Sequence, residues 1–200
     1  ACHRAREAGI DQAVYAAEQD GFTGRRLALM ADLRRAITDG QLVLVYQPVV
    51  DLRAGTAVAV EALVRWRHPE LGMIPPDEFI GLAEYTGAIR ELTGWVLDRA
   101  AADRRIWMGE GWPLGVAVNV SARNLADPAF PDQARRVLGA GGAAGEGIEL
   151  EITESTIMAD PDRARAVLTA LTGLGVRVSV DDFGTGYSSL AYLRRFPVHA

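Results

Sequence analysis

The chain has 200 residues, of which 49% are hydrophobic and 24% charged, and its formal net charge is -5 at pH 7. This composition is typical of a globular protein and excludes wholesale disorder. No apolar run reaches the roughly 18 residues of a membrane-spanning helix, and no basic-then-apolar leader opens the chain. The single cysteine excludes a disulfide framework, and the negative charge argues against binding to a nucleic-acid polymer. We therefore expect a cytoplasmic protein.

The hydrophobic pattern alternates between helices and short strands along the chain. After a charged, helical stretch over residues 1–20, a second helical pattern runs from Arg25 to Asp39. Apolar runs predict strands over 42–46, 57–63, 114–120, 148–152 and 176–180. Helices are expected over 76–85, 89–108, 130–138, 162–171 and 187–196.

Alternating strands and helices predict an α/β protein with a mainly parallel sheet, either doubly wound or closed into a barrel. Polar residues at or near the C-terminal ends of the predicted strands favour the barrel, because a barrel collects its functional residues along that whole edge. A doubly wound sheet would concentrate them at one switch point. At roughly 32 residues per strand unit, eight units would need about 250 residues. We therefore expect only about five of the eight units of a (β/α)8 barrel.

The polar residues at the predicted strand ends are Gln47, Glu61, Asn119, Glu151 and Asp181, with Asp182 following directly. Converging carboxylates repel one another unless a cation neutralises them, and oxygen ligands suit Mg²⁺, Mn²⁺ or Ca²⁺. The adjacent Asp181 and Asp182 could serve two ions that assist a phosphoryl transfer, and Arg65 is placed to hold a phosphate. The spacing alone therefore indicates a divalent-metal site on a parallel barrel.

Each of these residues also has a purely structural interpretation. A single acid at a strand end is more often a helix N-cap or a loop residue, and the residues after Asp181 could form only a turn. Asn119 and Ser121 could simply cap a helix. The glycines and serines of residues 184–189 lack Walker spacing, and the three histidines lack metal-ligand spacing. We expect the four tryptophans in the core or at its rim.

A series of short segments carries more specific information. They are 46–48 (YQP), 61–66 (EALVRW), 67–72 (RHPELG), 74–80 (IPPDEFI), 119–121 (NVS), 151–154 (EITE) and 181–190 (DDFGTGYSSL). Their order and spacing run unbroken from about residue 25 to residue 200. In this series the chain resembles the EAL domain, the family of cyclic di-GMP phosphodiesterases.

The resemblance implies a TIM-like barrel whose first strand runs antiparallel to the others. It also implies hydrolysis of cyclic di-GMP to linear pGpG with Mg²⁺ or Mn²⁺, two ions being expected. Carried over to this sequence, the metal ligands are Glu61, Asn119, Glu151, Asp181 and Asp182; three of them, Glu61, Asp181 and Asp182, are also catalytic through a metal-activated water. Gln47, Leu63 and Arg65 correspond to substrate contacts, with Arg65 on a phosphate. Glu154 corresponds to a glutamate that positions the loop 182–190, which the family uses for metal binding and for homodimer formation.

The last residues depart from the family pattern. In the family, a Pro-Val-Asp segment leads to a strand with a catalytic lysine, whereas here Pro197-Val198 is followed by His199 and the sequence, which contains no lysine, ends at Ala200. We therefore expect residues 1–200 to be an inactive piece of a longer, active phosphodiesterase. The alternative is a catalytically silent EAL module that binds cyclic di-GMP or regulates a protein partner. An unrelated metal-dependent barrel enzyme would not reproduce the order of the motifs.

The first residues hint at a neighbouring domain. Residues 5–9 (AREAG) and Tyr15 resemble the last helix and strand of a GGDEF, or diguanylate cyclase, domain, although a generic linker helix fits almost as well. The expected organisation is thus residues 1–20 as the end of a GGDEF domain or a linker, and residues 25–200 as an incomplete EAL domain. The longer bacterial signalling protein would carry its GGDEF domain upstream, with a membrane anchor conceivable further upstream.

Overall fold

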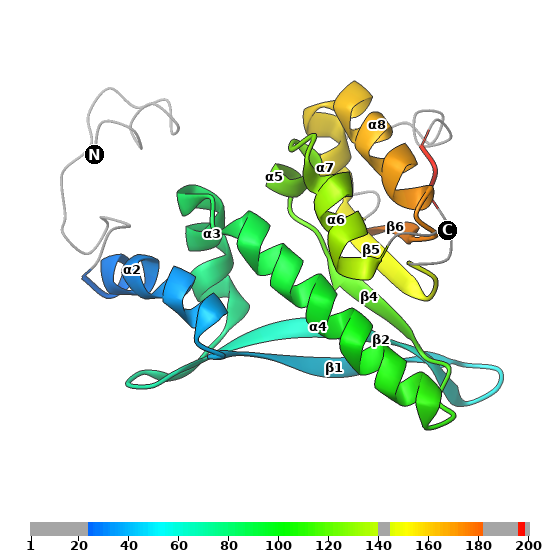
Figure 1. Cartoon of the computed structure of the whole chain (residues 1–200), viewed down its shortest axis with the longest axis horizontal. Helices are drawn as coiled ribbons and strands as arrows, with labels where there is room; N and C mark the ends of the chain where they lie inside the picture. Colours follow the sequence, from blue (N-terminus) through cyan, green and yellow to red (C-terminus); the bar gives the residue numbers. More distant parts are fainter. Residues whose placement is uncertain (1–23, 140–144, 182–195, 199–200) are drawn as a thin grey trace.

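The structure is a computed structural model, and it describes residues 24–139, 145–181 and 196–198 (Figure 1). The described helices are α2 (Gly24–Thr38), α3 (Pro76–Thr86), α4 (Ile89–Gly109), α5 (Ala122–Leu125), α6 (Phe130–Leu138), α7 (Glu154–Ala159) and α8 (Pro161–Thr172). The described strands are β1 (Leu42–Asp51), β2 (Thr56–His68), β3 (Gly72–Ile74), β4 (Gly115–Asn119), β5 (Ile148–Thr153) and β6 (Arg177–Asp181).

The described strands form one mixed sheet in the order β1-β2-β4-β5-β6, with β3 paired to β2. The strands β2, β4, β5 and β6 run parallel to one another, and helices connect them. In contrast, β1 pairs antiparallel with β2. This arrangement confirms the predicted α/β fold class, including the antiparallel first strand that the family resemblance implied.

Strands β1 and β2 are longer than the sequence pattern predicted, because they form a hairpin. The turn between them begins at Asp51, whose side chain accepts hydrogen bonds from the backbone N–H groups of Arg53 and Ala54. Ladder hydrogen bonds form regardless of side-chain polarity, so the hairpin extends beyond the apolar runs. As a result, Gln47 and Glu61 lie inside their strands and face each other in the ladder, and the prediction that they mark strand ends was wrong.

The longer helices lie close to their predicted positions. Helix α3 begins at Pro76 and ends at Thr86, and the following Gly87 adopts a left-handed conformation with φ of 80°. The sequence analysis missed α5, α7 and β3, because helices of four and six residues and a strand of three residues are too short to show their period. The helices predicted over residues 1–20 and 187–196 fall mainly or wholly outside the described residues.

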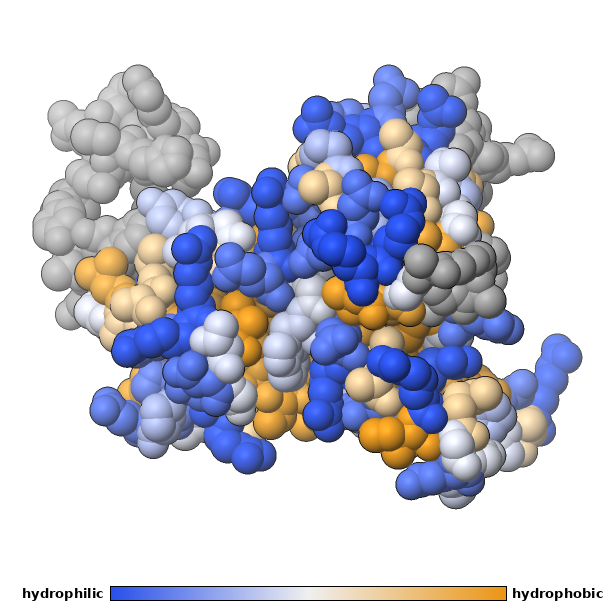
Figure 2. Space-filling model, viewed as in Figure 1, coloured by the Kyte–Doolittle hydropathy of each residue, from blue (hydrophilic) through white to orange (hydrophobic). Residues whose placement is uncertain are grey.

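One face of the sheet packs against the helices and forms the core. Alternate residues of the parallel strands point to this face, among them Val60, Ala62, Val116, Val118, Leu150 and Val178, all buried. Helix α4 crosses β1, β2 and β4, and α8 packs against β6 (Figure 1). The outer surface of the helices is largely hydrophilic, with small apolar areas between (Figure 2). The opposite face of the sheet carries the polar residues described below.

The tryptophans and histidines within the described residues are structural. As expected of core and rim residues, Trp66 is fully buried against Phe79, and both Trp95 and Trp107 pack at the edge of the core. Trp112 departs from the expectation, because its side chain is exposed. The ring of His68 accepts hydrogen bonds from two backbone N–H groups in the β2–β3 turn. None of the described helices has the length and hydropathy needed to span a membrane.

Candidate functional site

Five of the predicted site residues share one face of the sheet. Residues paired across a ladder point to the same face, and so do residues two apart on one strand. Gln47 pairs with Glu61, and Glu61 pairs with Ala117, two residues before Asn119. Asn119 in turn pairs with Glu151, whose neighbour on β6 is Ser179, two residues before Asp181. The register therefore aligns Gln47, Glu61, Asn119, Glu151 and Asp181 on the face opposite the helices, a row that we call the polar row.

Asn119 and Glu61 are in direct contact within the polar row. The side-chain amide Nδ2 of Asn119 donates a hydrogen bond to Oε1 of Glu61 over 2.7 Å, although the two residues lie on different strands. The bond leaves the amide oxygen of Asn119 and the second carboxylate oxygen of Glu61 available as acceptors. The neutral amide oxygen of Asn119 and the anionic oxygen of Glu61 therefore lie on the same face of the sheet, where both can accept a cation or a hydrogen-bond donor.

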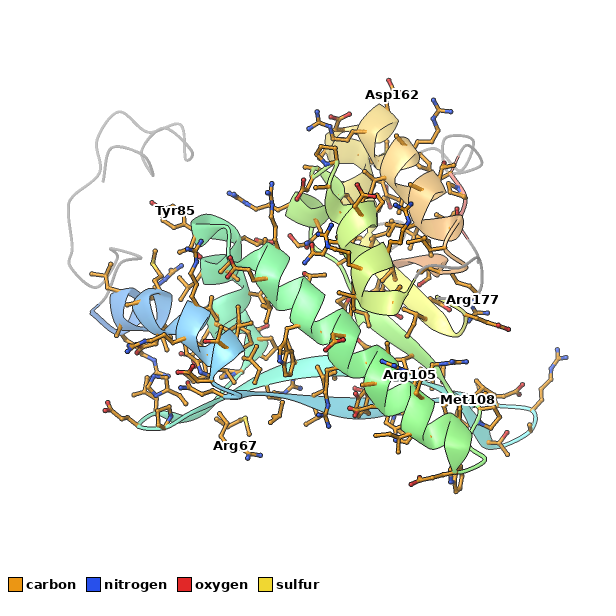
Figure 3. The ribbon with its side chains drawn as sticks, in the orientation of Figure 1. Arg67, Tyr85, Arg105, Met108, Asp162 and Arg177 are labelled. Atoms are coloured by element: carbon orange, nitrogen blue, oxygen red, sulfur yellow. The ribbon has the colours of Figure 1, made fainter. Side chains whose placement is uncertain are left out.

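The electrostatics of the row are most visible at Glu151. Its carboxyl group is half-buried, and this burial together with the negative charges of Glu61, Asp181 and Glu149 raises its pKa to about 7. Glu149 is compensated by an ion pair with Arg177 at the start of β6, which Figure 3 shows at the border of the domain. In the described part of the chain, no ion pair joins Glu61 or Glu151 of the polar row to an arginine. The carboxylates of the row therefore place negative charges close together.

The residues of the polar row fit a divalent cation. Carboxylate and amide oxygens are the ligands of Mg²⁺ and Mn²⁺, and a cation would relieve the repulsion that raises the pKa of Glu151. The hydroxyl group of Ser179, which pairs with Glu151, is buried without a hydrogen-bond partner. Within the described ranges, no three Asp, Glu, His or Cys side chains converge closely enough to hold a metal by themselves. The predicted ligand set adds the amide of Asn119 and the carboxylate of Asp182, which lies outside these ranges.

The other predicted substrate contacts follow Glu61 along β2. Leu63 and Arg65 lie two and four residues further and so project from the same face. Both residues line a cavity of about 270 Å³ between the ends of β2 and β4 and helices α3 and α4. Arg65 is half-buried, and its guanidinium group donates to the carbonyl oxygen of Val64 over 2.9 Å. Its remaining donors are suited to an anionic group such as a phosphate.

The wall of this cavity contains a polar contact that the sequence analysis missed. The hydroxyl group of Ser121 donates a hydrogen bond to Oε1 of Glu84 on α3 over 2.6 Å. Ser121 also caps α5, as the structural interpretation of the sequence predicted, by accepting from the backbone N–H of Arg123 over 3.1 Å. The family segment 119–121 and the predicted cap both pointed to Ser121, but no sequence signal pointed to Glu84, because its partner lies 37 residues away.

Glu154 is buried, with an exposed fraction of 3%, and begins helix α7 directly after β5. A carboxylate at this position interacts favourably with the positive end of the helix dipole. Its neighbour Thr153 pairs with Asp181, so Glu154 lies beside the point where β6 ends. The loop 182–190 that it is predicted to position lies outside the described residues, and so does the predicted dimer contact.

Comparisons with known proteins give a consistent result. The EAL domain family model matches residues 30–200. The chain is 48% identical over 177 residues to the cyclic di-GMP phosphodiesterase NbdA of Pseudomonas aeruginosa. The match covers 88% of this chain and 23% of that protein. It is 40% identical over 201 residues to the cyclic di-GMP phosphodiesterase PdeR of Escherichia coli, covering 100% of this chain and 30% of that protein.

A solved structure is similar to this chain in both fold and sequence. The PaMucR phosphodiesterase in complex with c-di-GMP matches with a TM-score of 0.78 and 44% identity, over 86% of this chain and 70% of that one. The two curated relatives are much longer than this chain, which spans less than a third of either. Since the family model covers well over half of the sequence and the polar row carries its segments, the chain belongs to the EAL domain family.

Proposed function

We propose that the protein hydrolyses cyclic di-GMP to linear pGpG, and that the polar row is its catalytic site. The observation that carries the proposal is the alignment of Glu61, Asn119, Glu151 and Asp181 on one sheet face, with the Asn119–Glu61 contact at its centre. The membership in the EAL family, and the relatives named as cyclic di-GMP phosphodiesterases, support the choice of substrate.

Membership in this phosphodiesterase family implies a dependence on divalent metal ions. We propose Mg²⁺ or Mn²⁺, two ions, with Glu61, Asn119, Glu151, Asp181 and Asp182 as ligands. Such ions, when bound, make water a stronger nucleophile near neutral pH and offset charge on a phosphodiester. The protein supplies the ligand oxygens, and the hydrogen bond from Asn119 fixes the orientation of the Glu61 carboxylate.

The remaining residues of the site would hold the substrate. Gln47 is exposed on the same face as Glu61, one strand away, where its amide can bond a nucleotide. Arg65 would pair with a phosphate through its free donors, and Leu63 would pack against the ligand beside it. Holding the phosphodiester in a fixed orientation over the polar row reduces the entropic barrier to attack by water.

The alternative is a catalytically silent EAL module that binds cyclic di-GMP or regulates a partner. Silent members of the family commonly lose acidic metal ligands, whereas this chain retains Glu61, Glu151, Asp181 and Asp182. We therefore favour the enzyme. The finer proposals for its assembly are a homodimer formed through the loop after Asp182 and a GGDEF domain upstream in the same protein.

The test is an assay of the natural full-length protein with cyclic di-GMP and Mg²⁺ or Mn²⁺, following the appearance of pGpG. Product that forms with the metal and stops with a chelator would support the proposal. Binding of cyclic di-GMP by calorimetry without any product would place the protein among the silent modules. If the protein neither binds nor hydrolyses cyclic di-GMP, both proposed roles toward this nucleotide are refuted, and regulation of a protein partner remains.

A further inference from the structure

Glu84 lies outside the polar row but touches the segment that carries one of its members. Its carboxylate accepts the hydroxyl hydrogen of Ser121 over 2.6 Å, the length of a strong, charge-assisted hydrogen bond. Both side chains are partly buried and line the same cavity as Arg65 and Asn119. The next residue, Tyr85, is 64% exposed and projects outward at the end of α3 in Figure 3. Glu84 therefore lies on the inward side of its helix.

The contact is made where the chain leaves the sheet. Ser121 follows Asn119 by two residues, and the intervening Val120 is bound to the sheet through its backbone N–H, which donates to the carbonyl of Glu151 over 2.9 Å. Beyond Ser121, the fully buried Asn124 accepts a hydrogen bond from Thr93 of α4. Helices α3 and α4 thus hold the turn after β4 at two separate points.

We propose that Glu84 is a positioning residue, which orients Asn119 by fixing Ser121. Asn119 is the last residue of β4 and is exposed, so β4 alone restrains its direction on one side only. The bond from Ser121 to Glu84 restrains the other side and keeps the Asn119 amide within reach of Glu61. This inference rests on the proposed function, because it assigns Glu84 a role in the cation site of the polar row. Glu84 itself contacts neither the metal nor the substrate.

The test compares three variants of the full-length protein: Glu84→Ala, Glu84→Gln and Ser121→Gly. Partners that orient a metal ligand typically contribute about 10- to 100-fold to metal affinity or activity. We expect Glu84→Ala to weaken Mn²⁺ binding, measured by electron paramagnetic resonance of the free ion, by about tenfold and to lower kcat similarly, with KM little changed. Glu84→Gln keeps an oxygen acceptor for Ser121 and should restore both values.

Ser121→Gly removes the same hydrogen bond from its other partner, so the inference can still be tested if Glu84→Ala does not fold. Glycine is nearly as good a helix N-cap as serine, so this change removes the donor to Glu84 at little expense to α5. We expect it to weaken Mn²⁺ binding as much as Glu84→Ala does. The matched control is Glu78→Ala on the same helix, where the partly exposed Glu78 pairs with Arg25. It should leave Mn²⁺ binding and turnover unchanged.

Two results would overturn the inference: unchanged Mn²⁺ affinity in both Glu84→Ala and Ser121→Gly, or a Glu84→Gln variant no better than Glu84→Ala. Failure of the proposed function is recognised separately. If the wild-type protein binds Mn²⁺ but does not hydrolyse cyclic di-GMP, the proposed function fails, and the Mn²⁺ affinities of the variants still decide the role of Glu84. A wild-type protein that binds no Mn²⁺ would overturn both.

Discussion

The carboxyl group of Glu151 makes the stability of the folded protein depend on pH. Burial and neighbouring carboxylates raise its pKa from 4.5 to about 7 in the folded protein, whereas in the unfolded chain it keeps its ordinary value. A raised pKa means that the folded state binds the proton more tightly, so deprotonation opposes folding. This destabilisation is absent below about pH 4.5, grows between pH 4.5 and 7, and is complete above pH 7 when no cation is present.

Glu151→Gln should remove this pH-dependent destabilisation. In the presence of a chelator, we expect the variant to melt at a higher temperature than the wild type at pH 8, and the difference to disappear at about pH 3.5, a unit below the ordinary pKa of 4.5, where Glu151 is protonated in both states. Calorimetry at both values measures it, with the exposed Glu70→Gln as control. A difference that is the same at both pH values would contradict the assigned pKa.

Arg65 is expected to bind the substrate in its ground state. Hydrogen bonds to charged groups contribute about 1.5–3 kcal/mol, so Arg65→Ala should raise KM for cyclic di-GMP by about 10- to 100-fold and leave kcat nearly unchanged. Steady-state kinetics give both constants. Arg67→Ala is the matched control, because Arg67 is exposed and points away from the domain in Figure 3. A lower kcat with constant KM would assign Arg65 to the transition state instead.

At the scale of elements, a polar contact ties helix α4 to the first strand. The hydroxyl group of Tyr46 on β1 donates to Asp103 of α4 over 2.6 Å, and Arg99 donates to the same carboxylate oxygen over 3.0 Å. The ring of Tyr46 also packs edge-on against Trp107, with 4.7 Å between ring centroids. Burial and the nearby Asp103 raise the pKa of Tyr46. The phenol therefore remains a donor throughout the physiological range.

Tyr46→Phe tests the importance of this tie. The change keeps the ring contact but leaves a nearly buried carboxylate with one donor fewer, which should reduce the free energy of unfolding by about 1–3 kcal/mol. KM for cyclic di-GMP should not change, because the tyrosine side chain points toward α4 and not toward the polar row. Denaturant unfolding measures the first effect. A loss below about 0.5 kcal/mol would show that the contact contributes nothing beyond an ordinary surface substitution.

How well each element could be predicted depended on its length and its partners. Helix α6 has the predicted bounds, and α3, α4 and α8 differ by one residue at an end or both, since their apolar spacing and prolines are local signals. The lengths of β1 and β2 could not be predicted from local sequence, because the pairing of the two strands in the hairpin sets them. The Asp51–Gly55 turn was the available signal, since Gly55 has a φ of 68° there and the carboxylate of Asp51 accepts two backbone N–H groups.

At the scale of the whole molecule, the sequence predicted candidate site residues but not how they meet. Residue type and strand position selected Glu61, Asn119 and Glu151, yet their common face follows only from the register of three strands, β2, β4 and β5. The Asn119–Glu61 bond spans 58 residues and the Ser121–Glu84 bond spans 37, so no local pattern contains them. The roles of the polar row toward a metal, and of Gln47, Leu63 and Arg65 toward a substrate, remain predictions.

The most direct measurement of the central proposal is the rate of pGpG formation from cyclic di-GMP by the full-length protein and its Glu61→Ala variant, with Mn²⁺, in one assay. Glu61 contacts Asn119 within the polar row, and the removal of one of few anionic ligands weakens the binding of the cation. We expect turnover by the wild type and by the control Glu78→Ala, and none by Glu61→Ala. Wild-type rates in Glu61→Ala would contradict it.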